Sequence, residues 1–225
     1  MGGARVAQDD RAPGGFELKV TKLDIVGEAE PFPITKDQSP EFLLDQRHLW
    51  LRSRKLTAIL KIRSTVVGAI HSFFRENGFY EFDAPILQPN QCEGGSTLFE
   101  VKYYEHKTYL SQSWQLYAEA GIFSLEKIYN MGLTFRAEKS KTSRHLSEFW
   151  MAEMEAAWMQ LSDIVEIAKK EIQYIIKQVL KHNTDELQIL DRDTKSLKEI
   201  LTKEIPTITY TEALQLLREK EGLDV

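Results

Sequence analysis

Charged and aromatic side chains alternate between residues 133 and 159, which read LTFRAEKSKTSRHLSEFWMAEMEAAWM. Because successive side chains of a β-strand point to opposite faces of a sheet, Arg136 and Glu138 share one face. On the strand expected to follow, Phe149, Glu153 and Glu155 share a face, and the opposite face is wholly apolar, with Trp150, Ala152, Met154, Ala156 and Trp158. The pattern predicts a hairpin with one face for packing and one charged face with an aromatic ring.

The loop between these strands, KSKTSRH, adds Arg144 and His145 to the charged face. Clustered cationic donors suit phosphate groups, and Phe149 could stack on an attached base. The alternative interpretation is a solvated sheet face with ion pairs across the strands. The loop favours the first interpretation, a nucleotide-like ligand bound on an antiparallel sheet.

The elements around this hairpin mix helices and strands without a regular β–α–β alternation. Apolar spacing predicts a long amphipathic helix over residues 44–76, ended by Asn77-Gly78, and a second long helix over 162–182. Strands are predicted around Pro85 and as a short hairpin over 101–112. This arrangement predicts an α+β fold, a largely antiparallel sheet flanked by helices.

The N-terminal part reads differently from the rest. Alternating apolar residues over 16–20 and 23–26 follow an APGG turn, which predicts a β-hairpin or two short strands. The polar segment TKDQSPEF then suggests a linker.

Composition excludes several classes of protein. The 225 residues carry a net charge of −5 and a single cysteine, which rules out an intrachain disulfide or a multi-cysteine metal site. No apolar run is long enough for a membrane span, and the first residues have no apolar signal core. We therefore expect a cytoplasmic protein with no membrane partner.

Several segments together resemble one family. FRAEKSKTSRHLSEF is similar to motif 2 of class II aminoacyl-tRNA synthetases, in the aspartyl, asparaginyl and lysyl subgroup, called subgroup b. ENGFYEFDAPIL resembles motif 1, EGGSTLF the mobile substrate loop, and SQSWQLYAEA the amino-acid-binding segment. RAPGGFELKVTKLDIV resembles the last part of the OB-fold anticodon-binding domain, a β-barrel.

The resemblance implies a division of the chain. Residues 1–34 would be the remnant of the OB-fold domain, 35–47 a linker, and 48–225 the N-terminal part of the catalytic domain. Motif 1 would cover about 56–88 and motif 2 about 133–159. In this family the motif 1 helix implies a homodimer.

The resemblance also implies how ATP would be bound. Arg136 would bind the α-phosphate and the amino-acid carboxylate, and so act as the catalytic residue by stabilising the transition state. Glu138 would accept a hydrogen bond from the adenine amino group, Phe149 would stack on adenine, and Arg144 and His145 would contact the β- and γ-phosphates. Mg²⁺ is expected with the triphosphate.

The amino-acid substrate follows from the segment around residue 118. Aspartyl members have a lysine there that meets the substrate carboxylate, whereas this chain has Ala118 followed by Glu119. A carboxylate can accept a hydrogen bond from the NH₂ group of a carboxamide. The replacement of the lysine by Ala118 and Glu119 therefore favours asparagine as the amino acid and tRNA(Asn) as the tRNA. FRAEKSKTSRHL and EMEAAWM also resemble asparaginyl members, especially those of the archaeal type, more than aspartyl ones. The alternative for Glu119 is an exposed helix residue. Other amino-acid-binding residues would be Glu93, Ser113 and Gln115.

The chain departs from the family pattern after residue 160. No glycine-rich segment ending in arginine is present, which is the family's motif 3, and its acidic metal ligands are missing too. We therefore expect no metal ligands in this chain, a fragment of a longer enzyme, and impaired adenylation by the fragment. Three alternatives remain open: an aspartate-specific enzyme, a related asparagine synthetase, and a non-catalytic truncated paralogue.

Overall fold

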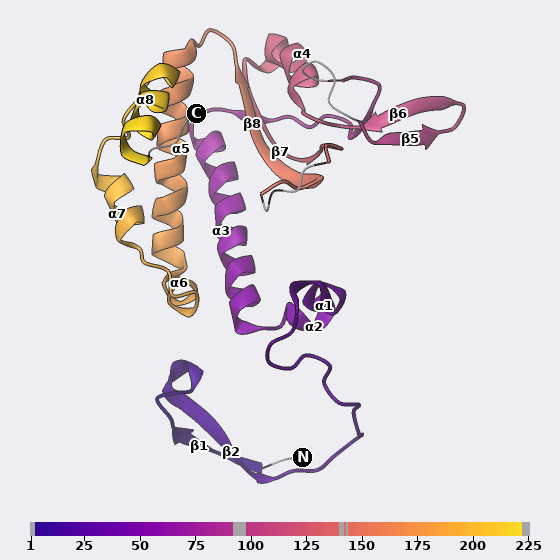
Figure 1. Ribbon diagram of the computed structural model, residues 1–225, viewed down its shortest axis with the longest axis vertical. Helices are drawn as coiled ribbons and strands as arrows, with labels where there is room; N and C mark the ends of the chain where they lie inside the picture. Colours follow the sequence, from indigo (N-terminus) through magenta and orange to yellow (C-terminus); the bar gives the residue numbers. More distant parts are fainter. Residues whose placement is uncertain (1–2, 92–97, 140–141, 143, 222–225) are drawn as a thin grey trace. The chain divides into compact units, whose positions relative to one another are not determined.

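The computed structural model describes residues 3–91, 98–139, 142 and 144–221 (Figure 1). The chain divides into two compact units, Met1–Arg52 and Ser53–Val225. This boundary lies five residues past the segment 35–47 that we expected as a linker, and that segment includes a short helix, Pro40–Asp45.

The first unit contains a β-hairpin whose strands differ from the expected ones. Strand β1 (Gly3–Gln8) pairs antiparallel with β2 (Phe16–Lys22). The turn between them includes Gly14 and Gly15, with φ of 79° and 78°, values that favour glycine. The prediction of a second strand over residues 23–26 was wrong, because β2 pairs with the preceding segment and not with the following one.

Two short helices complete this unit, α1 (Pro40–Asp45) and α2 (Arg47–Trp50). The single helix predicted over 44–76 is therefore interrupted, and the long helix α3 spans Arg54–Glu76. Ser53 accounts for its start, since the Ser53 hydroxyl accepts a hydrogen bond from the Leu56 N–H at 3.3 Å. At the other end, the predicted left-handed Gly78 is confirmed, with φ of 81°.

The second unit contains two small sheets. Strand β7 (Lys127–Phe135) lies between β3 (Tyr80–Glu81), which runs parallel to it, and β8 (Glu148–Ala156), which runs antiparallel. The other sheet has the order β4 (Leu87–Gln88), β6 (His106–Leu110), β5 (Glu100–Tyr103), all antiparallel. The predicted α+β class is confirmed.

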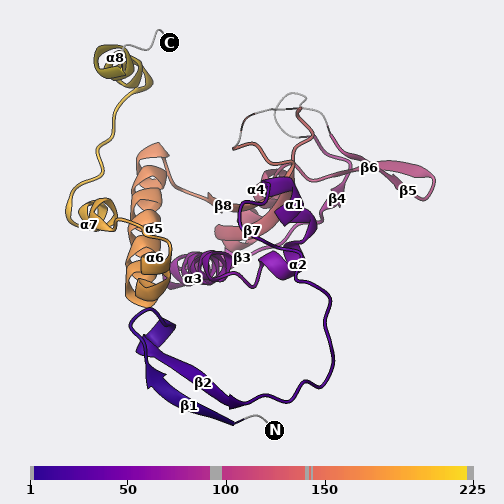
Figure 2. The same ribbon diagram turned by 60° about the horizontal axis from the view of Figure 1, so that its bottom comes forward.

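Helices cover both faces of the β3–β7–β8 sheet. Helices α3 and α5 (Leu161–His182) pack on one face, around a core that includes Phe73, Phe74, Phe79 and Tyr129. Helix α4 (Gln115–Leu125) covers part of the other face, where Trp114 and Ala118 pack on Ile128. Three further helices follow, α6 (Thr184–Ile189), α7 (Lys195–Thr202) and α8 (Tyr210–Glu221), as Figure 2 shows from a second side.

The apolar face of β8 packs as the alternation predicts toward the end of the strand, but not at Trp150 near its start or at Trp158 beyond its end. Met154 and Ala156 pack against the α3–α5 core as predicted, but Trp150 is 50% exposed and Trp158 is 92% exposed. Trp158 has φ of 64° and follows the last strand residue, Ala156. The prediction that Trp158 packs was wrong, because the alternation of side chains ends where the strand ends.

Candidate functional site

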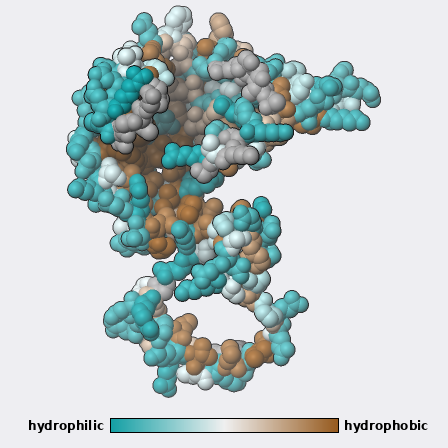
Figure 3. All heavy atoms as spheres, viewed as in Figure 1, coloured by the Kyte–Doolittle hydropathy of each residue, from teal (hydrophilic) through white to brown (hydrophobic). Residues whose placement is uncertain are grey.

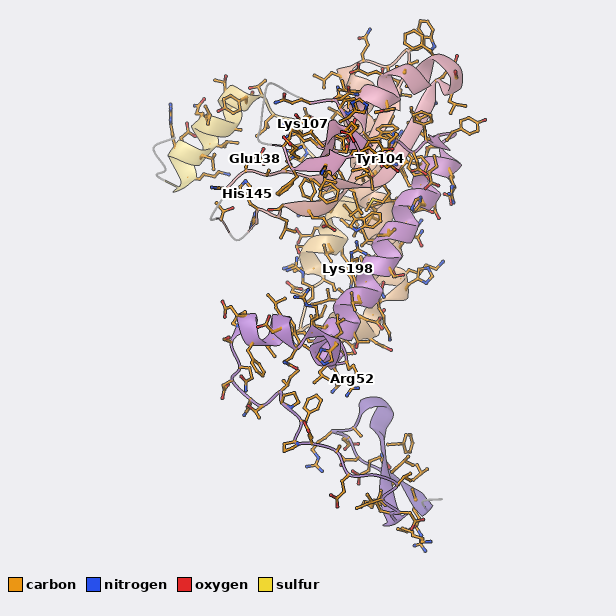
Figure 4. The ribbon with its side chains drawn as sticks, turned by 90° about the vertical axis from the view of Figure 1, so that its right-hand side faces the viewer. Arg52, Tyr104, Lys107, Glu138, His145 and Lys198 are labelled. Atoms are coloured by element: carbon orange, nitrogen blue, oxygen red, sulfur yellow. The ribbon has the colours of Figure 1, made fainter. Side chains whose placement is uncertain are left out.

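A cavity of about 510 Å³ lies where β7 and β8 lead into their connecting loop. Its lining consists of the five residues predicted to bind a nucleotide, together with Leu146: Arg136, Glu138, Arg144, His145 and Phe149. The Arg136 N–H donates to the Ser147 carbonyl at 3.0 Å, which extends the pairing of the strands beyond Phe135. Glu138 and His145 lie close together in Figure 4.

Contacts within the cavity orient its cationic and aromatic groups. The Arg136 guanidinium lies over the Phe149 ring, 5.8 Å from its centroid, a cation–π arrangement. The His145 ring Nδ1 contacts the Thr142 hydroxyl, and the His145 N–H donates to the Thr142 carbonyl at 3.3 Å. The cavity thus offers a ring for stacking, three cationic or imidazole groups for an anion, and the Glu138 carboxylate as an acceptor.

The start of helix α4 is attached to β8 through Glu153. The Ser113 hydroxyl donates to one Glu153 carboxylate oxygen at 2.6 Å, and the Trp114 N–H donates to the other at 3.2 Å. The Gln115 N–H in turn donates to the Ser113 hydroxyl at 3.1 Å. Sequence reasoning put Glu153 on the charged face but gave it no role, and the structure shows that it positions Ser113 and Gln115.

Three carboxylates gather on this face near α4. The Gln115 amide donates to Glu119 at 3.1 Å. Burial, and then the negative charges of Glu119 and Glu153, raise the pKa of Glu155 above its ordinary value of 4.5. Ala118 is fully buried against Trp114 and Ile128, so it adds no polar group to this face.

The carboxylates and the cavity share one face of the sheet. In the β7–β8 register, Thr134 pairs with Phe149 and Asn130 pairs with Glu153, so all four side chains lie on the same side. Four residues along a strand separate Phe149 from Glu153, a distance of about 13 Å. Of the predicted site residues, Glu93 alone lies outside the described residues.

The raised pKa of Glu155 predicts how the stability of the protein depends on pH. A carboxyl group whose pKa is higher in the folded state stabilises the fold below its unfolded pKa, and this contribution is lost as pH rises through the folded pKa. Replacement Glu155→Gln is therefore expected to increase the free energy of unfolding at pH 7, and this gain should disappear as the pH falls to about 4. Urea denaturation of both proteins across this range is the measurement, and an equal gain at pH 4 and pH 7 would contradict the electrostatic cause.

The described residues contain neither a cluster of metal ligands nor a membrane-spanning helix. Among the described residues, no three His, Cys, Asp or Glu side chains are arranged to hold a metal ion. In the same part of the chain, none of the helices is both long and apolar enough to cross a membrane.

Comparisons with known proteins match the part of the chain that contains the cavity residues. The family model for class II tRNA synthetases (D, K and N) matches residues 39–224. An asparagine--tRNA ligase of Koribacter versatilis is 49% identical over 218 residues, which cover 95% of this chain and 49% of that protein. One from Thermoplasma acidophilum is 46% identical over 209 residues, which cover 93% of this chain and 48% of that protein.

Solved structures agree with these sequence matches. The crystal structure of asparaginyl-tRNA synthetase from Pyrococcus horikoshii complexed with asparaginyl-adenylate has a TM-score of 0.88 and 42% identity, covering 99% of this chain and 51% of that one. An asparaginyl-tRNA synthetase from Entamoeba histolytica has a TM-score of 0.77 at 26% identity, covering 99% of this chain and 52% of that one. The chain spans about half the length of the curated relatives it matches. By these matches, the chain belongs to the family of class II tRNA synthetases (D, K and N).

Proposed function

We propose that this chain forms the nucleotide- and amino-acid-binding part of an enzyme that ligates asparagine to tRNA(Asn) at the expense of ATP. The observation that carries the proposal is the cavity that unites Arg136, Glu138, Arg144, His145 and Phe149. Support comes from the relatives, which are asparagine--tRNA ligases, one of them solved with asparaginyl-adenylate.

The proposed reaction has two steps. An oxygen of the asparagine carboxylate attacks the α-phosphorus of ATP, a new bond joins that oxygen to phosphorus, and pyrophosphate leaves with the electrons of the broken bond. A hydroxyl of the terminal tRNA adenosine then attacks the activated carbonyl, and AMP leaves. A carboxylate is already nucleophilic, so the first step needs no base from the protein.

In this scheme the cavity residues act through charge and position. Arg136 neutralises the charge that builds up around the α-phosphate in the transition state. Phe149 stacks on adenine, Glu138 accepts from its amino group, and Arg144 and His145 bind the outer phosphates. Mg²⁺ would bind with the triphosphate and reduce its negative charge.

The choice of asparagine over aspartate rests on the carboxylates near α4. Glu119 can accept a hydrogen bond from a carboxamide NH₂ group. A substrate carboxylate would instead meet the like charges of Glu119 and Glu153, with no cation at buried Ala118 to offset them. This observation favours the asparagine enzyme over the aspartate enzyme.

The proposed partners are tRNA(Asn) and a second copy of the chain, in the cytoplasm. Dimerisation through the motif 1 helix is supported by apolar side chains along α3, which gather on the surface in Figure 3. Ile59 and Leu60 on this helix are 40% and 46% exposed.

Binding of non-hydrolysable adenylate analogues tests the proposal without requiring turnover. We expect the chain to bind asparaginyl sulfamoyl adenosine about tenfold or more tightly than the aspartyl analogue in calorimetric titrations. Replacement Glu119→Gln should reduce this preference. Equal or tighter binding of the aspartyl analogue would favour the aspartate enzyme, and binding of neither analogue would favour the non-catalytic alternative.

A further inference from the structure

The β5–β6 hairpin ends in an exposed aromatic tip. Tyr103 pairs with His106, so a loop of two residues, Tyr104 and Glu105, joins the strands. Tyr104 is 80% exposed, and its ring meets the Tyr103 ring edge-on with centroids 4.8 Å apart. The hairpin projects from the rest of the second unit in both ribbon views (Figures 1 and 2).

The backbone of Tyr104 is in an unfavourable conformation. Its φ is 52°, in the left-handed region that bulky residues rarely adopt. The first position of a two-residue hairpin loop with positive φ is ordinarily occupied by glycine, asparagine or aspartate. A tyrosine here neither packs in a core nor relaxes the turn, and strain of this kind concentrates at ligand-binding sites.

Two lysines lie next to this tip, on the face of the hairpin opposite the Tyr103 side chain. Lys102 and Lys107 are direct partners in the β5–β6 register, and like charges directly opposite each other are unfavourable. The Lys107 ammonium donates to Glu100 at 3.1 Å, which raises the pKa of Lys107. Within the described part of the chain, Lys102 has no ion-pair partner. An anionic ligand across Lys102 and Lys107 would relieve their repulsion.

The base of the hairpin is attached to the strand that leads into the nucleotide cavity. Strand β6 runs directly into Ser111, whose carbonyl accepts from the Phe135 N–H at 2.8 Å. Phe135 immediately precedes Arg136, which lines the cavity. At about 3.3 Å per residue, the five residues of β6 place the tip roughly 17 Å from this attachment. In Figure 4 Tyr104 and Lys107 are on the hairpin, which points toward the viewer.

We propose that the β5–β6 tip binds single-stranded RNA, with a base stacked on Tyr104 and the backbone phosphates across Lys102 and Lys107. Stacking on an exposed aromatic ring beside cationic groups is how proteins bind single strands without reading their sequence. An acidic peptide could meet the lysines but would not use the ring. The proposal rests on the proposed function, in which the unpaired 3′ end of tRNA has to reach the nucleotide cavity.

Replacement Tyr104→Gly separates binding from folding, because glycine fits the φ of this position better than tyrosine does. We expect the variant to fold with the hairpin intact and to bind fluorescently labelled tRNA(Asn) transcript about tenfold more weakly in anisotropy titrations. Tyr210→Ala is the matched control, since Tyr210 is a similarly exposed tyrosine on α8 (78%) and its removal should leave binding unchanged.

The contribution of Lys102 and Lys107 is tested by the salt dependence of RNA binding. Replacing both Lys102 and Lys107 with alanine should reduce the slope of log affinity against log salt by about 1.4, because each single-strand phosphate contact contributes about 0.7. Lys198→Ala on α7 serves as the control for loss of a surface lysine.

Three results would overturn the proposal. The first is that Tyr104→Gly binds the transcript as tightly as the unmodified chain does. The second is that the unmodified chain does not bind the transcript. The third is that polyglutamate competes with the transcript for binding as strongly as unlabelled RNA does. Binding of the asparaginyl-adenylate analogue is measured on the same samples. If the analogue binds while the hairpin variants show no RNA effect, the hairpin proposal fails and the proposed function stands.

Discussion

Replacement Arg136→Ala is expected to slow asparaginyl-adenylate formation by about 100- to 1000-fold and to weaken ATP binding by about tenfold or more. The backbone N–H of Arg136 donates to the Ser147 carbonyl, and the Arg136 guanidinium lies over the Phe149 ring in the lining of the cavity. A group positioned in this way stabilises the developing charge without reorganisation. Calorimetric titration of this chain with ATP measures the binding loss, and asparagine-dependent pyrophosphate exchange by a full-length enzyme that carries the same change measures the rate. Arg136→Lys should recover only part of the loss, because lysine keeps the charge but not the forked donors.

Arg63→Ala provides a matched control. The Arg63 guanidinium also lies 5.8 Å from an aromatic centroid, that of Trp150, but on the opposite face of the sheet. Its removal should leave ATP binding unchanged. If Arg63→Ala and Arg136→Ala weaken ATP binding equally, the assignment of the nucleotide to the Arg136 cavity is wrong.

Replacement Phe74→Ala is expected to lower the free energy of unfolding by about 3–5 kcal/mol. Phe74 is 2% exposed, and its ring stacks on Tyr129 at 4.8 Å and meets Phe73 and Phe79 edge-on at 5.5 and 5.3 Å. Truncation would leave a cavity where α3 packs on β7, among the rings of Phe73, Phe79 and Tyr129. Urea denaturation followed by circular dichroism is the measurement.

The control for this change is Phe123→Ala on α4. Phe123 is 91% exposed, so its truncation should change the free energy of unfolding by no more than about 0.5 kcal/mol. Similar losses for the two variants would mean that the α3–β7 core does not carry the stability assigned to it here.

Much of the nucleotide cavity was predictable because its residues are close in sequence. Phe149 lies in β8, and Arg136 continues the pairing of the strands opposite Ser147, so the period of two residues along a strand determines which face they share. Glu138 follows two residues later, beyond the end of β7. The predicted set therefore lines one cavity without any need to know what packs behind the sheet. The roles of these residues toward ATP stay predictions that the Arg136 and adenylate-analogue experiments test.

Local patterns were less informative at the ends of elements. The stripe of apolar residues over 44–76 continues through Ser53, but the Ser53 hydroxyl caps a new helix there. The apolar alternation likewise continues to Trp158, but the chain leaves the strand after Ala156. Hydrophobic period alone does not show where backbone hydrogen bonding stops.

By itself, then, the sequence determined the fold class, the two faces of the β7–β8 hairpin and the resemblance to the synthetase family. Only the tertiary structure decided that Glu153 holds the start of α4, through a hydrogen bond to Ser113 across 40 residues of chain. It also decided that Ala118 is buried and that Tyr104 is exposed in a strained turn beside two lysines. The physical reason is the same in each case: side-chain period is a local property, whereas contacts between distant segments depend on how the helices and sheets pack together.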